Sequence, residues 1–439
     1  MINTKPLDYN EFNLILKKKN FLFEKKPHIA ICVSGGVDSL ALLILMNKWI
    51  KKKKGLLTVL HFNHKLRDDS KKEEFFVKNI CSQLKVVFKA FSWNVPRQKS
   101  SIMKNARDAR YKKFIEYCSK EGIISLMTAH HRDDCLETYL MRKKRRYATL
   151  GLNAIPTQNI QKNLQILRPL IDICKKRLIN TCKKNNFNWI SDPSNENNKY
   201  ERAKVRKYIS SLNQNCFKNI NVDFRNSQIE NTKTEKKLND FLINNLSFFD
   251  YGKFVLKKDK LLANCQSLQI EVVKRILVTC SGTIYPPKTL SVKSLVRKIK
   301  IKDKFISSLN WCIINVKPNL IEFYREYQKI KRYCSTKTIL KKNKSFLWDN
   351  RFVIETSKND LTCEAMNEKK WLFIKKKYKS VNYNRQIHFD VIKTLPIIKV
   401  KKKLIIPYFL NQSELEKNSV RVLFNPIIPL TKKNFLNIN

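Results

Sequence analysis

The sequence lacks the patterns that mark secreted, metal-clustered and membrane-spanning proteins. Its twelve cysteines include no Cys-x-x-Cys pair, whereas disulfide frameworks belong to small secreted domains and metal sites need closely spaced ligands. We therefore expect reduced, mostly buried thiols in a cytoplasmic protein. No apolar run approaches the length of a membrane span, and residues 1–19 carry no signal-peptide pattern, so we expect no membrane partner.

Acidic residues are also scarce. The chain of 439 residues has 36 Asp and Glu against 89 Lys and Arg, which gives a formal net charge of +53. Such an excess predicts a polyanionic partner, most simply a nucleic acid, although Lys is abundant along the whole chain and part of the charge reflects codon bias. The length predicts two or three domains and leaves the oligomeric state open.

The two commonest glycine motifs for nucleotides are absent. Neither Gly-x-x-x-x-Gly-Lys-Ser/Thr nor Gly-x-Gly-x-x-Gly occurs. Instead, an apolar β-branched run at residues 29–33 leads into Ser34-Gly-Gly-Val-Asp-Ser39, and a Leu-rich run follows at residues 40–50. A strand, a glycine turn and a helix aim backbone N–H groups at an anion. An ordinary strand-to-helix turn is the alternative, but two serines and an acid at these positions favour phosphate binding.

This hexapeptide supplies the first candidate site residues. It resembles the pyrophosphate loop of ATP pyrophosphatases, which cleave ATP between its α- and β-phosphates. We expect ATP to contact Ser34, Gly35, Gly36, Val37 and Ser39. Asp38 is an acid where phosphate oxygens would sit, so it is better explained as a magnesium ligand.

Further strands are expected at residues 56–62, 86–91 and 123–129, alternating with helices at 70–84 and 101–121. This alternation predicts an α/β fold with a parallel, doubly wound sheet that is covered on both faces. Ligands of such sheets lie at the carboxyl ends of the strands. That rule places three segments along one edge of the sheet, namely residues 34–39, 61–67 and 130–137.

Charged residues in these segments suggest the chemistry. Asp134 and Glu137 are three apart at a helix start and face the same side, so with Asp38 they are candidates for holding magnesium and orienting an amine. Arg107 and Arg110 have the same spacing and are candidates for neutralising phosphates, with a solvated helix face as the alternative. His130 and His131 suggest zinc, but no Cys or carboxylate pattern completes such a site, and they better suit the wall of a nucleotide pocket.

Six motifs occur in an order that resembles the tRNA(Ile)-lysidine synthetase family of PP-loop ATP pyrophosphatases. They are Ser34–Ser39, His61-Phe-Asn-His-Lys-Leu-Arg67, Ala106-Arg-Asp-Ala-Arg-Tyr111, Thr128-Ala-His-His-Arg-Asp-Asp134 with Glu137-Thr138, Leu167-Arg-Pro-Leu170 and Trp189-Ile-Ser-Asp-Pro-Ser-Asn195. The resemblance implies a sheet like that of adenine nucleotide alpha hydrolases. It also implies ATP and Mg²⁺ as cofactors, with free L-lysine and a tRNA(Ile) that carries a CAU anticodon as partners.

In that family the enzyme adenylates the C2 oxygen of the wobble cytidine, and the ε-amine of lysine then displaces AMP. The resemblance, together with the spacings above, assigns a role to each candidate. Catalysis is expected of Asp38, Asp134, Glu137, Arg107 and Arg110, with Asp38 and Asp134 also holding the metal, and Asp134 or Glu137 accepting the proton of the amine. Residues 34–39 and His61 are expected to bind the nucleotide. The residues expected to contact the substrate or the tRNA are Asn63, His64, Arg67, His130, His131, Arg202 and Arg206.

The second half of the chain matches the family less closely. Residues 213–235 are polar and predict a linker. Residues 236–304 favour helices, residues 305–326 alternate like strands, and residues 371–374 and 404–410 also predict strands. We therefore expect three parts: a catalytic domain at 1–212, a linker with a helical substrate-binding domain at 213–340, and a small β-rich domain at 341–439 that grips tRNA.

Other readings remain open. A tRNA cytidine thiolase shares the loop, but its chemistry uses cysteine pairs. A glutamine-dependent amidotransferase or an NAD-type synthetase also shares the loop, but neither needs a charge of +53. A different class is a degenerate RNA-binding scaffold, against which Asp38, Asp134 and Glu137 argue because all three acids are present.

Overall fold

The computed structural model describes the greater part of the chain in two compact units. The described residues are 4–63, 70–93, 102–145, 155–161, 164–190, 201–333, 338–358, 361–377, 387–400, 403–405 and 419–431. Unit 1 runs to Thr232, and unit 2 begins at Lys233. No helix in these described ranges is long and apolar enough to cross a membrane.

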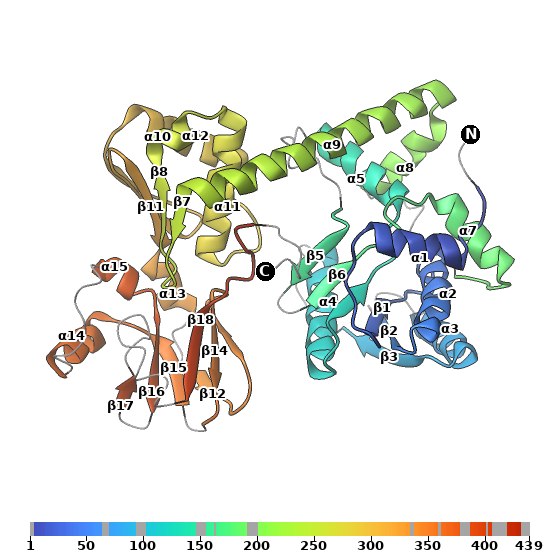
Figure 1. Cartoon of the computed structure of the whole chain (residues 1–439), viewed down its shortest axis with the longest axis horizontal. Helices are drawn as coiled ribbons and strands as arrows, with labels where there is room; N and C mark the ends of the chain where they lie inside the picture. Colours follow the sequence, from blue (N-terminus) through green and yellow to red (C-terminus); the bar gives the residue numbers. More distant parts are fainter. Residues whose placement is uncertain are drawn as a thin grey trace. The chain divides into compact units, whose positions relative to one another are not determined.

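Unit 1 is built on a six-stranded sheet with the order β3-β2-β1-β4-β6-β5 (Figure 1). Every neighbouring pair is parallel except β5 and β6. The strands are β1 (His28–Cys32), β2 (Leu56–Asn63), β3 (Val87–Ser92), β4 (Ser125–Met127), β5 (Gln158–Gln161) and β6 (Leu164–Leu167). The first four lie where the sequence predicts them, and the parallel α/β sheet is confirmed.

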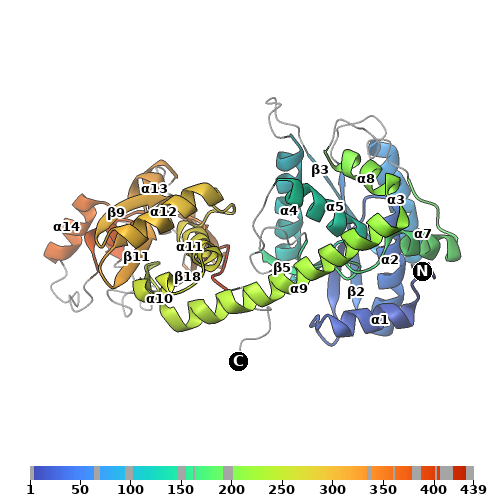
Figure 2. The same ribbon diagram turned by 90° about the horizontal axis from the view of Figure 1, so that it is seen from above.

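Helices cover both faces of this sheet (Figure 2). They are α1 (Tyr9–Lys18), α2 (Val37–Lys52), α3 (Ser70–Leu84), α4 (Ile102–Lys120), α5 (Arg132–Lys144), α7 (Lys175–Lys184) and α8 (Glu201–Ser211). Alternation along β1 explains the two faces, because Ile29 and Ile31 pack with α1, α2, α3 and α7, whereas Ala30 packs with α4. The sheet is thus doubly wound, as predicted.

The polar segment expected as a linker is helical. Residues 214–235 belong to the long helix α9 (Gln214–Asn245). Phe217, Ile220 and Phe224 pack with buried residues of α5, and Leu238 is buried further along. One apolar residue per turn is enough to fix a helix against a neighbour, and the many Asn and Thr residues between these positions hide that period.

The described residues of unit 2 form three antiparallel sheets, in the orders β7-β8-β11-β10-β9, β12-β15-β16-β17 and β13-β14-β18 (Figure 1). Their strands are β7 (Leu246–Phe248), β8 (Phe254–Lys257), β9 (Phe305–Leu309), β10 (Cys312–Val316), β11 (Leu320–Arg325), β12 (Thr338–Leu340), β13 (Phe346–Trp348), β14 (Phe352–Thr356), β15 (Leu361–Ala365), β16 (Pro396–Val400), β17 (Lys403–Ile405) and β18 (Val420–Phe424). The helices are α10 (Lys258–Leu262), α11 (Gln266–Ser281), α12 (Thr289–Ile301), α13 (Tyr327–Tyr333), α14 (Glu368–Lys377) and α15 (Phe389–Ile392).

Two predictions for unit 2 need correction. The expected strand at Trp371 lies in helix α14, where Trp371 and Ile374 are buried while Leu372 and Phe373 are exposed. Two buried residues that lie three positions apart share one face of a helix. Asn367 caps this helix, because its side chain accepts the N–H of Lys370. The helical stretch expected at 236–304 also contains β7 and β8.

The strands expected at 305–326 are confirmed as β9, β10 and β11. Of the expected strand at 404–410, only its start falls within the described residues, in β17. The β-rich character of the C-terminal part is confirmed, while the boundaries of a three-domain division stay a prediction.

Candidate nucleotide and substrate site

The glycine loop between β1 and α2 is held in a fixed shape by its own serines. The Ser39 hydroxyl donates to the Gly36 carbonyl at 2.9 Å and accepts the Ser34 N–H at 3.2 Å. Gly36 caps α2 and brings no side chain to that end of the helix. The N–H groups of the first turn of α2 have no carbonyl partner within the helix, so the loop and the helix start can receive an anion.

Gly35 gives the loop its turn. Its φ of +94° lies in the region that side chains disfavour, and an added Cβ would contact Val77 and Ile190. The Gly35 carbonyl also accepts the N–H of Ile190 at 3.0 Å. The chain segment before residue 191 is therefore anchored directly to the loop.

Two residues predicted to contact ligands make hydrogen bonds within unit 1. The buried His61 places Nδ1 2.9 Å from the Val33 carbonyl, at the end of β1. The buried Asn63 donates to the Ser70 carbonyl and to the Glu74 carboxylate, which ties β2 to α3. His64 and Arg67 lie outside the described residues.

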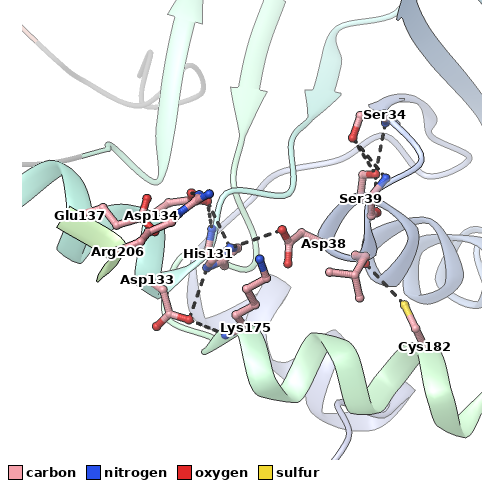
Figure 3. Close-up of polar contacts among 12 residues, drawn as sticks. Ser34, Asp38, Ser39, His131, Asp133, Asp134, Glu137, Lys175, Cys182 and Arg206 are labelled. Carbon is pink, nitrogen blue, oxygen red and sulfur yellow. Dashed lines mark hydrogen bonds and ion pairs between the residues drawn. The ribbon is translucent and has the colours of Figure 1, made fainter. Parts of the chain in front are cut away.

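His131 joins the loop to the acids of α5 (Figure 3). Its Nε2 lies 3.5 Å from Oδ2 of Asp38 and 3.5 Å from Oδ2 of Asp134, and its ring is almost fully buried. Asp134 is further held because Oδ2 accepts the N–H of His131 at 3.1 Å. The acids predicted to act together are thus brought together, with an imidazole between them.

The charges of this group reinforce one another. Burial alone would lower the pKa of His131, but the hydrogen bond to Asp38 and the charges of Asp134 and Asp133 outweigh it and raise that pKa. Burial alone would raise the pKa of Asp134, but the charges of His131 and Arg202 and the hydrogen bond from the His131 N–H outweigh it and lower that pKa. Asp134 therefore stays an anion and is a weak base.

Glu137 is clamped by two arginines of α8. Its buried carboxylate accepts a hydrogen bond from Nε of Arg202 at 2.7 Å and another from Nε of Arg206 at 2.6 Å. Arg202 and Arg206 are four apart and share one face of α8, and Arg202 also lies 3.6 Å from Oδ1 of Asp134. The two arginines predicted to touch tRNA therefore bind the acids of α5, and both Glu137 oxygens are already accepting hydrogen bonds.

The remaining predicted residues lie at the same edge of the sheet. Arg107 and Arg110 project from α4 over the ring of Tyr111, with their guanidinium carbons 5.5 and 5.4 Å from its centroid. His130 is bonded to the hydroxyl of Thr128 at 2.8 Å. Burial and then the charges of Arg168, Arg107 and Arg110 lower the pKa of His130 to about 3, so its ring is neutral.

Sequence reasoning missed three residues of this region. Asp133 lies 3.8 Å from Nδ1 of His131 and accepts the first N–H of α7, from Lys175. Cys182 donates from α7 to the Val37 carbonyl at 3.5 Å. Arg168 directly follows β6 and is buried. Only Arg168 left a signal, because an arginine inside the apolar run Leu167-Arg-Pro-Leu170 calls for a buried partner.

Asp38 fits a metal ligand. Its Oδ1 is buried and has no hydrogen-bond partner among the described residues, and a free carboxylate oxygen beside a phosphate site is the donor Mg²⁺ prefers. Within the described ranges, no group of three or more His, Cys, Asp or Glu residues is placed to hold a metal. Mg²⁺ sites often use only one or two carboxylates, with substrate phosphates and water completing them.

Comparisons with known proteins agree with this geometry. Residues 8–212 match the PP-loop domain family. The chain is 31% identical over 408 residues to the tRNA(Ile)-lysidine synthase of Rickettsia bellii (strain RML369-C), covering 91% of this chain and 93% of that protein. It is 30% identical over 427 residues to the tRNA(Ile)-lysidine synthase of Orientia tsutsugamushi (strain Boryong), covering 92% and 94%. With the nucleotide loop intact and the similarity running through both units, the chain belongs to the tRNA(Ile)-lysidine synthase family of ATP-using PP-loop enzymes.

Proposed function

We propose that the protein joins the ε-amine of free L-lysine to C2 of the wobble cytidine in the CAU anticodon of tRNA(Ile). In the first step the C2 oxygen attacks the α-phosphate of ATP, and pyrophosphate leaves. In the second step the amine forms a bond to C2 and AMP leaves with the oxygen. The observation that carries this proposal is the preformed loop at Ser34–Ser39, facing the acids of α5 in a chain of this family.

The loop suits the first step. Charge builds up on the leaving pyrophosphate, and the N–H groups at the start of α2 are fixed before the reaction, so they need no rearrangement. The Ser34 hydroxyl would add a donor at the same place, whereas the Ser39 hydroxyl already donates to the Gly36 carbonyl. Mg²⁺, when held by Asp38 and Asp134, would neutralise phosphate oxygens.

The acids of α5 suit the second step in a way that differs from the sequence prediction. A carboxylate with a lowered pKa, such as Asp134, attracts and orients an ammonium group but is a poor acceptor for its proton. Glu137 holds α8 in place, because both of its oxygens accept arginine N–H groups. We therefore propose that Asp134 orients lysine, and that Glu137 with Arg202 and Arg206 is a positioning group.

Basic charge supports an RNA partner. A net charge of +53 favours binding to a phosphate backbone, and bases of an anticodon loop can be splayed out for recognition. Lysine and the CAU anticodon are the specific part of the proposal.

The test is to measure AMP formed from labelled ATP with lysine, with tRNA(Ile), with both and with neither. We expect AMP to form only when both are present. AMP formation that needs RNA and a sulfur donor but no lysine would support a thiolase instead. RNA binding that is independent of ATP, without any AMP, would support a non-catalytic scaffold.

A further inference from the structure

Three guanidinium groups converge on one tyrosine at the carboxyl edge of the unit 1 sheet. Arg107 and Arg110 of α4 lie over the ring of Tyr111, and the Tyr111 side chain hydrogen-bonds to Arg168. Arg168 directly follows β6, and the Leu167 carbonyl accepts the N–H of Thr128 just beyond β4. The three cations are therefore held together beside the β4–α5 connection.

Arg168 is unusual because it is buried and no described carboxylate forms an ion pair with it. Only 4% of the residue is exposed, one terminal nitrogen donates to the Pro156 carbonyl at 2.8 Å, and Nε is buried with no partner among the described residues. Burial, followed by the charge of Arg107, lowers its pKa, and Tyr111 only partly opposes this. A buried cation of this kind is costly unless an anion joins it.

Other buried arginines of the chain show the usual arrangement. Arg177 is paired with Glu11, and Arg325 and Arg351 both contact Asp349. By contrast, within the described part of the chain no ion pair joins Arg107, Arg110 or Arg168 to a carboxylate. Three guanidinium groups are therefore clustered, one of them is buried, and no carboxylate of the described residues balances their charge.

We propose that Arg107, Arg110 and Arg168 form a second phosphate-binding site, separate from the glycine loop. The ligand class is a phosphate group, because guanidinium groups donate in pairs to its oxygens. Its source is either a phosphodiester of the RNA substrate or the released pyrophosphate. This inference rests on the proposed function only for the choice of RNA probe.

The position of β6 explains why the site is separate. In the sheet order, β6 is two strands from β1, which carries the loop. Neighbouring strands are about 4.8 Å apart, so β1 and β6 are roughly 10 Å apart across the sheet. A group bound at Arg168 would therefore lie beside, and not within, the phosphates that the loop holds.

The test measures binding without turnover. Pyrophosphate, and separately an RNA hairpin with a CAU loop, are titrated into the full chain without lysine at several salt concentrations. The variants are the double change Arg107→Gln with Arg110→Gln and the single change Arg168→Lys. Arg107 is exposed and Arg110 is half-buried. Arg168→Lys keeps the charge but loses the paired N–H donors of the guanidinium group. Lys112→Gln is the matched control, since it removes an exposed cation from the same helix.

We expect the double variant to lower the affinity for at least one probe about tenfold or more. A loss of this size corresponds to one or two charge-assisted hydrogen bonds. For an RNA phosphodiester, the slope of log affinity against log salt falls by about 1 per lost contact. Loss confined to pyrophosphate assigns the site to the product, and loss confined to the hairpin assigns it to RNA. Binding of both probes equal to that of Lys112→Gln would overturn the proposal.

Arg168→Lys adds a check on geometry. If its melting temperature matches that of the parent chain, we expect a loss for the same probe as in the double variant. If it fails to fold, the double variant decides alone. The binding measurements do not depend on the formation of AMP or lysidine. Failure of this proposal is therefore distinguishable from failure of the proposed function.

Discussion

His131 and Asp38 are linked across the sheet edge, with Nε2 of the imidazole 3.5 Å from Oδ2 of the carboxylate. The contact joins the first turn of α2, where the nucleotide loop ends, to the residue that precedes α5. Because the same Nε2 also lies 3.5 Å from Oδ2 of Asp134, the loop and the substrate side of the site share one network. A change at either end is therefore expected to act on chemistry more than on RNA binding.

Asp38→Ala should abolish AMP formation and leave RNA affinity nearly unchanged. The variant removes a carboxylate beside the phosphates, and RNA binding rests on basic charge spread over the chain. AMP release from labelled ATP and equilibrium binding of tRNA measure the two effects. Asp172→Asn, which removes an exposed acid paired with Lys19, is the control. Equal loss of both activities would mean that Asp38 is structural.

Gly35→Ala should weaken ATP binding, whereas Gly122→Ala should not. Both glycines have positive φ, at +94° and +68°, so each change costs about 1–2 kcal/mol of stability. A Cβ at Gly35 would meet Val77 and Ile190, but a Cβ at Gly122 would meet nothing within 4 Å. Calorimetric titration with a non-hydrolysable ATP analogue separates the two. Unchanged affinity in Gly35→Ala would show that the loop shape is not needed.

Glu137 and Arg206 should behave as one unit in a double-mutant cycle. We expect a coupling free energy of about 1–3 kcal/mol between Glu137→Gln and Arg206→Gln, because the carboxylate is buried and accepts a charged donor. Urea unfolding of the full chain gives the four values. The exposed pair of Arg145 and Glu201 is the control, with an expected coupling below about 1 kcal/mol. Additive effects at Glu137 and Arg206 would contradict the clamp.

His130 should make the folded chain less stable in acid. Burial and Arg168 lower the pKa of His130 to about 3, while the unfolded chain binds this proton near pH 6.5. Its contribution to stability is therefore present above pH 6.5 and is lost as the pH falls toward 3, by up to about 1.4 kcal/mol per pH unit. From pH 7.5 to pH 5, the parent chain should lose more unfolding free energy than His130→Gln. An imidazole NMR signal of His130 that titrates near pH 6.5 would contradict this.

The strands and loop of unit 1 were predictable because their signals are local. The apolar run before Ser34 is bounded by glycine, and the helix that follows has no competing pattern. Helix α9 was not predictable in the same way, since only residues such as Phe217 and Phe224 carry its period among many polar ones. At Trp371, four apolar residues in a row fit either a strand or a helix. The segment is a helix in which Trp371 and Ile374 are buried, and this burial depends on the tertiary structure.

The roles of site residues were harder to predict than their positions. Spacing alone showed that Asp134 and Glu137 share a helix face, but not that Arg202 and Arg206 would fill both Glu137 oxygens. These arginines come from a helix far along the chain, so their partner depends on how α8 packs on α5. The same limit applies to His61, whose buried contact with Val33 cannot be told from a ligand contact by sequence.

The most direct measurement is to incubate the protein with labelled lysine, ATP and total tRNA, and then to identify the labelled RNA. We predict that label enters a single isoleucine tRNA, with one AMP released for each lysine incorporated, and that Asp38→Ala incorporates none. Label in several tRNAs, or incorporation that proceeds without ATP, would contradict the account.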